Sequence, residues 1–308
     1  MQLPFELQSA IDEIVEKTNP TVLKRAREGL TQDYRSGGTS LFNDEAKRLA
    51  YLSARMPATF AAVHKALQNI PFLSGHVLDL GAGPGTASWA IADLFPLVNQ
   101  FTLIEKSSDA ISLGQALAKN HPLLQQAKWT QQSLGTAQIP CADAAILSYV
   151  LNELSDSATL IEQCWQAVPL LIIVEPGTPK GFHLIRKVRQ QLIDLKAHLI
   201  APCPHAFACP IQGGDWCHFS ARVERTRLHR LIKEGSLGYE DEKFSYLIAS
   251  KIPGSQFSGR IIRHPLKNSG HVRLTLCSNS GKIEEKTVTR KSTEFYRKAR
   301  DADWGDSF

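Results

Sequence analysis

The first seventy residues place apolar side chains three or four positions apart, with polar side chains between them. Leu7 and Ile11 begin this pattern, which is the spacing of one face of an α-helix. The pattern predicts three helices: over residues 4–30 with an interruption at Pro20, from a cap at Asn43 or Asp44 to Arg55, and after Pro57. We therefore expect an N-terminal helical region over residues 1–70.

From residue 71 the pattern changes to short apolar runs that alternate with helical segments. We expect strands at 76–80, 101–105, 128–132, 144–150 and 170–175, and helices at 87–94, 109–119 and 158–168. Strands that alternate with helices are joined by right-handed crossovers and build a parallel sheet. The sequence therefore predicts an α/β fold in this part of the chain.

The pattern after this sheet is less regular. We expect a helix over Gly181–Leu199, a basic helix from His218 to Glu234 closed by Gly235, and a strand over 244–250. The remaining residues predict a small β module with a hairpin at Ser280–Gly281. Because a chain of 308 residues exceeds the usual size of one core, we expect three regions, over 1–70, 71–250 and 251–308.

A glycine-rich turn follows the first strand of the predicted sheet. The sequence Val77-Leu-Asp-Leu-Gly-Ala-Gly-Pro-Gly-Thr86 puts glycines where the backbone must turn tightly and let a ligand approach. Glu105 ends the next strand, where a carboxylate can accept both ribose hydroxyls of an adenosine cofactor. The turn resembles motif I of the class I S-adenosylmethionine methyltransferases; the alternative is a fold whose glycines only make the turn. The resemblance implies a cofactor site on Asp79, Gly81, Ala82, Gly83, Gly85 and Glu105.

Three of the six cysteines lie within one short loop. Cys203, Cys209 and Cys217 are separated by proline, glycine and few charges, which predicts an irregular turn. Three thiolates in such a loop, with a fourth from Cys277 in a later segment, match the ligand count of an iron–sulfur cluster or a structural zinc. The sequence therefore predicts a metal centre that joins residues 203–217 to a distant part of the chain.

The ligand set leaves the identity of the metal open. Cysteine thiolates hold both zinc and iron–sulfur clusters. Zinc also accepts imidazole nitrogen, so His205 or His218 could replace a cysteine in a zinc site. The remaining alternative is a set of ordinary buried cysteines, since free cysteine is among the residue types most often buried.

The positive charge of the chain is concentrated in its last third. Residues 222–308 contain 18 Lys and Arg against 11 Asp and Glu, whereas the whole chain has a net charge of only +5. A basic segment of this kind indicates a polyanionic partner such as RNA; the alternative is a solvated charged face. The candidate RNA-binding residues are Arg222, Arg225, Arg227, Arg230 and Lys233 in the predicted basic helix, and Arg290, Lys291, Arg297, Lys298 and Arg300 in the tail.

Nothing in the sequence predicts a membrane span or an export signal. No apolar run reaches the roughly 18 residues that a span needs, and the N-terminus has acidic residues and no apolar core. Six cysteines in a chain of this length, without an export signal, favour a reducing compartment. We therefore expect a cytoplasmic protein that is monomeric and has no membrane partner.

Six stretches spread over most of the chain carry a further resemblance. They are Ala50–Thr59, Gly81–Thr86, Glu175–Pro179, Cys203–Phe219, Phe244–Tyr246 and Ala299–Asp306. Together they resemble the methyltransferase-like assembly factors of the mitochondrial small ribosomal subunit and their bacterial relatives. The resemblance implies a Rossmann-like methyltransferase sheet with N-terminal helices, an inserted iron–sulfur loop at 203–217 and a small C-terminal β module.

The same resemblance implies a function. It implies a [4Fe–4S] cluster on Cys203, Cys209, Cys217 and Cys277, and association with small-subunit rRNA during ribosome assembly. No catalytic motif is recognisable, because the segment after the fourth strand has the sequence Ser148-Tyr-Val-Leu-Asn-Glu153. We therefore expect an rRNA-binding assembly factor that binds S-adenosylmethionine; the alternative is an active rRNA methyltransferase with a structural cluster or zinc. The missing transit peptide indicates a bacterial relative.

Overall fold

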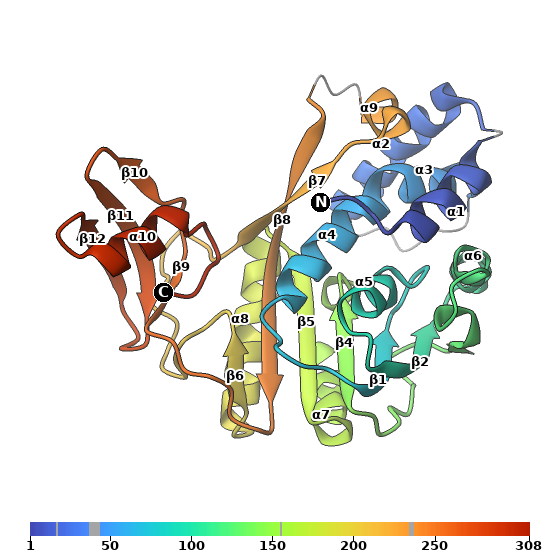
Figure 1. Cartoon of the computed structure of the whole chain (residues 1–308). Coiled ribbons are helices and arrows are strands. Elements are labelled where there is room, and N and C mark those ends of the chain that lie inside the picture. The colour runs from blue at the N-terminus through green and yellow to red at the C-terminus, as the bar shows by residue number, and fades with distance from the viewer. Residues whose placement is uncertain (17, 37–43, 155, 234–236) are drawn as a thin grey trace. The chain divides into compact units, whose positions relative to one another are not determined.

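The fold is described by a computed structural model, drawn in Figure 1, for all residues except 17, 37–43, 155 and 234–236; the side chains of 30–36 and 227 are also not described. Its residues form two compact units. The first consists of Met1–Val168 with Ala221–Glu242, and the second of Pro169–Ser220 with Lys243–Phe308. The boundaries of these units differ from those of the expected regions 1–70, 71–250 and 251–308. The division into three regions stays a prediction.

The N-terminal part of the first unit is helical, as the sequence predicts. Its elements are α1 (Phe5–Val15), α2 (Pro20–Ser36), α3 (Glu45–Ala50), the π-helical turn η1 (Tyr51–Arg55) and α4 (Met56–Leu67). The expected interruption at Pro20 is confirmed, since α1 ends at Val15 and α2 begins at Pro20. Proline fits the first helical position, where no N–H donor is needed. Asp44 caps α3 by accepting the Lys47 N–H, as expected; Asn43, the other expected cap, lies outside the described residues.

The first unit also contains a parallel sheet. Its strands are β1 (Gly75–Leu80), β2 (Val98–Glu105), β3 (Lys128–Gln131) and β4 (Ala144–Ser148), in the order β3-β2-β1-β4. The connecting helices are α5 (Thr86–Leu94), α6 (Ser108–Ala118) and α7 (Ser157–Ala167), with short 3₁₀ turns η2 (Leu124–Gln126) and η3 (Leu151–Glu153). Because β1 pairs with β2 on one side and β4 on the other, the strand order reverses there. This arrangement is Rossmann-like, and it confirms the predicted α/β fold.

The main strands of the second unit form an antiparallel arrangement. They are β5 (Leu170–Pro176), β6 (His198–Ala201) and β8 (Tyr239–Ser250), of which β8 pairs antiparallel with both β5 and β6. The helix expected over Gly181–Leu199 is wrong at its end, since α8 covers Pro179–Asp194 only. Lys196 has a left-handed φ of 65°, which ends the helical path and releases the following residues to pair with β8.

The basic helix expected from His218 to Glu234 is also wrong. Residues Phe219–Glu224 form strand β7, which pairs with β8, and only Arg227–Lys233 form a helix, α9. Phe219, Ala221 and Val223 are buried and alternate with less buried residues, which is the period of a half-buried strand. The expected closing residues Glu234 and Gly235 lie outside the described residues.

The C-terminal residues of the second unit form a small sheet. Its strands are β9 (Gly259–Ile261), β10 (Leu266–Asn268), β11 (His271–Ser278) and β12 (Ile283–Thr289), and α10 (Thr293–Asp301) follows. The order is β10-β11-β12, and β9 pairs with the other end of β11. Gly281 has a φ of 81°, a conformation that suits glycine, in the predicted turn between β11 and β12. In the described part of the chain, no helix has both the length and the apolar character needed to cross a membrane.

Candidate functional site

A cavity of about 600 Å³ lies in the first unit, at the carboxyl ends of β1, β2 and β4. Asp79, Glu105 and Ser148, at or near these three strand ends, line it together with the start of α5. Ligands of open α/β sheets bind at the carboxyl ends of the strands, where the strand order reverses. The cavity is therefore at the position and of the size expected for a small-molecule ligand.

The glycine turn forms one wall of this cavity. Gly81, Gly83 and Gly85 have φ values of 71°, 54° and 82°, which L-residues with side chains rarely adopt. A Cβ added at Gly83 would meet no atom within 4 Å, whereas one at Gly81 would lie 2.5 Å from Val150 Cγ2. Gly83 therefore leaves free space beside the backbone, and Gly81 is needed for close packing.

Asp79 is almost fully buried, with 1% of its surface exposed. Its Oδ2 accepts hydrogen bonds from the Ser88 backbone N–H (3.1 Å) and hydroxyl (2.7 Å), whereas Oδ1 has no protein partner. Burial raises the pKa of Asp79 to about 6, although the hydrogen bonds from Ser88 oppose this shift. A buried carboxylate oxygen without a donor fits a site that receives a cationic group of a ligand.

Glu105 is held at the end of β2 by the backbone. Its Oε2 accepts the Gly83 N–H and its Oε1 accepts the Ser107 N–H, both at 2.9 Å. A carboxylate oxygen has two lone pairs, so each oxygen can accept one more hydrogen bond from a ligand hydroxyl. Of the six predicted cofactor residues, Gly85 does not line the cavity and instead precedes α5; the other five, Asp79, Gly81, Ala82, Gly83 and Glu105, do.

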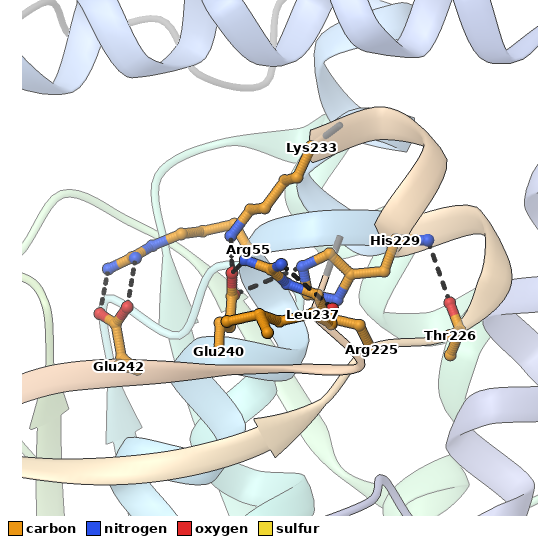
Figure 2. Close-up of polar contacts among 8 residues, drawn as sticks. All are labelled: Arg55, Arg225, Thr226, His229, Lys233, Leu237, Glu240 and Glu242. Carbon is orange, nitrogen blue, oxygen red and sulfur yellow. Dashed lines mark hydrogen bonds and ion pairs between the residues drawn. The ribbon is translucent and has the colours of Figure 1, made fainter. Parts of the chain in front are cut away.

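Two residues that the sequence analysis did not identify line the same cavity. Arg55 ends the π-helical turn, and Tyr149 follows β4 with an unusual φ of 61°. The guanidinium of Arg55 lies 5.0 Å from the centre of the Tyr149 ring, and Nη2 is 3.0 Å from Glu242 Oε1, an ion pair visible in Figure 2. Tyr149 also donates to Glu242 at 3.1 Å. Backbone strain and π-turns occur often at functional sites, but neither can be recognised from sequence.

A second cavity, in the second unit, is lined by all four predicted metal ligands. Cys203, Cys209 and Cys217 from the loop and Cys277 from β11 are among its lining residues. Phe182 and Ile211 are among its apolar residues, and no aspartate or glutamate belongs to its described lining. The structure thus brings the thiols of two distant segments together.

Cys277 is buried, and Cys203, Cys209 and Cys217 are partly buried. Burial raises the pKa of the Cys203 thiol and raises that of Cys277 to about 12. Burial and the neighbouring cysteines also raise the pKa of Cys217 well above its ordinary value. The thiolate form that a metal requires is therefore disfavoured unless a cation compensates its charge.

The side chains around this cavity do not have the geometry of a single bound ion. In the described residues, no group of three or more His, Cys, Asp or Glu is arranged to hold one metal ion. His205 lines the cavity, with Nε2 at 3.5 Å from Cys277 Sγ, whereas His218 does not line it and contacts the Trp216 carbonyl. The four cysteines thus line one cavity, and the described residues around it contain no preformed site for a single ion.

The predicted RNA-binding residues divide into two sets. In the first, Arg222 pairs with Asp241, and Arg225 and Lys233 pair with Glu240, which Figure 2 shows for the last two. Arg230 is exposed in α9, and the Arg227 side chain lies outside the described part. The second set lies between β12 and α10 and within α10. It is exposed and, in the part of the chain that is described, has no ion pairs to Asp or Glu: Arg290, Lys291, Arg297, Lys298 and Arg300. Their contact with RNA stays a prediction.

Comparison with known proteins gives one family. The family model described as mitochondrial small ribosomal subunit Rsm22 matches residues 45–308. The "Rsm22-cox11 tandem protein 2, mitochondrial" of Schizosaccharomyces pombe is 24% identical over 370 residues, which cover 97% of this chain and 49% of that protein. The human "Ribosome assembly protein METTL17, mitochondrial" is 26% identical over 292 residues, covering 85% of this chain and 62% of that protein. The chain thus spans about half the length of the yeast relative.

Solved structures give a weaker likeness. A SAM-dependent methyltransferase from Aquifex aeolicus superposes with a TM-score of 0.43 and 15% sequence identity. The superposition covers 67% of this chain and 97% of that structure. The fold assignment therefore stands on the strand order and register described above.

Proposed function

Because the chain belongs to the Rsm22 family of mitochondrial small ribosomal subunit proteins, we propose that it assists assembly of a small ribosomal subunit by binding its rRNA. We propose further that it is a methyltransferase-like protein that binds S-adenosylmethionine and holds a [4Fe–4S] cluster. One observation carries this proposal: besides belonging to the family, the chain has a cavity at its glycine turn and a second cavity lined by four cysteines. The cytoplasmic location expected from the sequence stays a prediction, since both relatives named above are described as mitochondrial.

The glycine-turn cavity supports the proposal for S-adenosylmethionine. The unpartnered Oδ1 of Asp79 would receive the ammonium group of the methionine part, and Glu105 would accept the ribose hydroxyls. Gly83 leaves the space that a ligand needs beside the turn. When bound, S-adenosylmethionine would supply an activated methyl group. Ser148 and Tyr149 line the same cavity.

The cysteine cavity supports a cluster more than a zinc ion. Zinc–sulfur bonds of about 2.3 Å in a tetrahedral site bring the sulfurs to within about 4 Å of one another. In the described residues no group of three or more such ligands is arranged to hold a single metal ion, although all four cysteines line one cavity. A cluster of several iron and sulfide atoms separates its thiolates further, so it fits thiols that surround a common space.

The exposed basic residues within and just before α10 support the proposal for RNA. Lys291 and Arg297 are exposed and free of ion pairs to carboxylates in the described part of the chain, so no internal ion pair has to break before they contact phosphates. Lys298 is also exposed, and its Nζ lies 5.1 Å from the centre of the Phe308 ring. Arg225 and Lys233, by contrast, already neutralise Glu240. We therefore propose that the exposed basic residues within and just before α10 make the phosphate contacts, and that Arg225 and Lys233 mainly stabilise the fold.

Two experiments test this proposal. Protein purified without oxygen should be brown and contain about four iron and four sulfide per chain. Colourless protein with one zinc would overturn the cluster. Depletion in the source organism should cause small-subunit precursors to accumulate on sucrose gradients, and a normal gradient profile would overturn the assembly role.

The phosphate contacts are tested by RNA affinity as a function of salt. Lys291→Gln and Arg297→Gln each remove one cation that would neutralise a phosphate, so each should reduce the slope of log K against log salt by roughly 0.7–0.9. Arg222→Gln is the matched control, because Arg222 pairs with Asp241. An equal change in the control would show that Lys291 and Arg297 have no special role.

A second function, rRNA methylation, is favoured by one specific observation. The cavity extends past the glycine turn to Arg55 and Tyr149, which leaves lining residues for a methyl acceptor. Transfer of a tritiated methyl group from S-adenosylmethionine to small-subunit rRNA would establish this activity. If protein that binds both the cofactor and the rRNA transfers no methyl group, methylation is excluded and the assembly role remains as the proposed function.

A further inference from the structure

Arg189 is a buried cation beside the cysteine cavity. It projects from α8, only 3% of its surface is exposed, and it lines the cavity. Its Nε donates to Cys203 Sγ at 3.3 Å, and its Nη2 donates to the carbonyls of His205 and Phe207, both at 2.8 Å. These three hydrogen bonds from the Arg189 guanidinium therefore all go to residues of the cysteine loop.

The charge of Arg189 has no carboxylate partner in the described part of the chain. No aspartate or glutamate belongs to the described lining of the cavity, and none of the ion pairs among described residues involves Arg189. Buried arginine is rare unless it is paired, because burial removes the hydration of its charge. Two carbonyls and a neutral thiol leave this charge only partly compensated.

A second buried arginine approaches the same loop from the small sheet. Arg260 on β9 is 4% exposed, and its Nε donates to the Pro202 carbonyl at 2.9 Å, next to Cys203 in the sequence. Its Nη1 donates to the Gly305 carbonyl at 2.8 Å. The two guanidinium groups therefore hold the backbone on both sides of Cys203.

We infer that Arg189 and Arg260 are the built-in counter-charges of an anionic four-thiolate centre, and that Arg189 is a positioning residue whose N–H···S bond to Cys203 raises the reduction potential of that centre. The inference rests on the cluster proposed above. A [4Fe–4S] cluster with four cysteine thiolates carries two negative charges, and uptake of one electron adds a third. A fixed, buried cation at a short distance stabilises the more negative, reduced state.

A purely structural role would give a different result. If Arg189 only fixed the loop through the His205 and Phe207 carbonyls, then a variant that holds the cluster would keep the wild-type potential. Hydrogen bonds to sulfur and local charge are among the factors that set the potential of such clusters. The reduction potential therefore separates the two roles.

The test compares Arg189→Gln and Arg189→Lys in full-length protein with its cluster, prepared without oxygen. Glutamine keeps N–H donors and removes the charge, whereas lysine keeps the charge and loses the fork. Arg186→Gln is the matched control, because Arg186 lies on the same helix and lines the same cavity but is exposed to solvent. Each potential is measured by titration with dithionite, followed by the visible spectrum and the paramagnetic signal of the reduced state.

We expect a clearly more negative potential for Arg189→Gln, a smaller shift for Arg189→Lys and no shift for Arg186→Gln. The Arg189→Gln cluster should also bleach several-fold faster in air. Fully iron-loaded Arg189 variants with the wild-type potential would overturn this inference and leave the proposed cluster intact. Folded Arg189→Gln protein that cannot hold iron, next to Arg189→Lys protein that can, would support the counter-charge role. Wild-type protein without iron and sulfide would overturn the proposed cluster itself.

Discussion

The two cavities of this protein bury opposite charge. The glycine-turn cavity is lined by four carboxylates and two cations, and its most buried charged group is Asp79, with one oxygen unpartnered. The cysteine cavity is lined by two arginines, with no carboxylate in its described lining. Each cavity therefore contains a buried charged group, Asp79 in one and Arg189 in the other, that the described protein groups around it do not fully neutralise.

This difference indicates what each cavity is built to hold. A buried charge is stable only when a partner of opposite sign compensates it. The acidic cavity suits a cationic ligand, and S-adenosylmethionine carries a sulfonium and an ammonium group. The arginine-lined cavity suits an anionic centre, which four thiolates around a cluster provide. The same physical rule thus supports both of the occupants that we propose for this chain.

Removing one ligand from the cysteine cavity should have the largest effect. In Cys277→Ser we expect loss of most iron and sulfide, because a serine oxygen is a poor substitute for a thiolate. Ligand bonds of a metal centre contribute to folding free energy, so the stability of the second unit should fall by several kcal/mol. Metal analysis and limited proteolysis of residues 251–308 measure both effects.

Cys141→Ser is the matched control for this prediction. Cys141 is exposed and belongs to the first unit, so its replacement should leave iron content and protease resistance unchanged. Full iron content in Cys277→Ser would contradict the assignment of that ligand.

A smaller effect is expected in the acidic cavity. Asp79→Asn removes the charge that would face the ligand ammonium, and a hydrogen bond to a charged group contributes about 1.5–3 kcal/mol. We therefore expect S-adenosylmethionine to bind roughly ten- to a hundredfold more weakly, as measured by calorimetry. Because the pKa of Asp79 is about 6, wild-type affinity should rise with pH up to about 6 and level off above it.

The asparagine variant should lose this pH dependence, since it has no carboxyl group to titrate. Glu153→Gln is a suitable control, because Glu153 lines the same cavity but is partly exposed and pairs with Lys106. Its effect should be less than about 1 kcal/mol. A pH dependence that persists in Asp79→Asn would assign the titration to another group.

The two cavities also differ in how much the sequence could predict. The glycine turn, Asp79 and Glu105 lie within one β-α-β segment, where strand, turn and acidic residue follow one another at short range. The resemblance to an assembly-factor family is confirmed by the match over residues 45–308. Short-range patterns of this kind survive in a single sequence because neighbouring residues determine the local backbone.

The sequence could not predict features that depend on contacts between residues far apart along the chain. Strand β6 continues an apolar helical pattern, and only its pairing with β8 makes it a strand. Arg189 has the sequence context of a polar position on a helix, and nothing nearby indicates that it turns toward Cys203. Tyr149 and Glu242 meet although 93 positions separate them. Tertiary contacts override local preference at each of these places.

The smallest effect is expected where the charge is already balanced within the protein. Glu240 is 13% exposed, accepts from Lys233 at 2.7 Å and Arg225 at 3.0 Å, and lies 3.3 Å from His229 Nε2. This cluster needs no occupant, so Glu240→Gln should leave iron content and cofactor affinity unchanged. It should lower the free energy of unfolding by about 1.5 kcal/mol at neutral pH.

The pH dependence of this loss has a defined sign. Burial alone would raise the pKa of Glu240, but the hydrogen bonds from His229 and Lys233 lower it well below its ordinary value. Its stabilisation is therefore present above about pH 4.3, the unfolded pKa, and is lost as the pH falls further. Denaturant unfolding should show wild type and Glu240→Gln converging in acid. Asp241→Asn, which breaks an exposed pair with Arg222, should cost less than about 1 kcal/mol; a larger loss than in Glu240→Gln would contradict the importance of burial in this comparison.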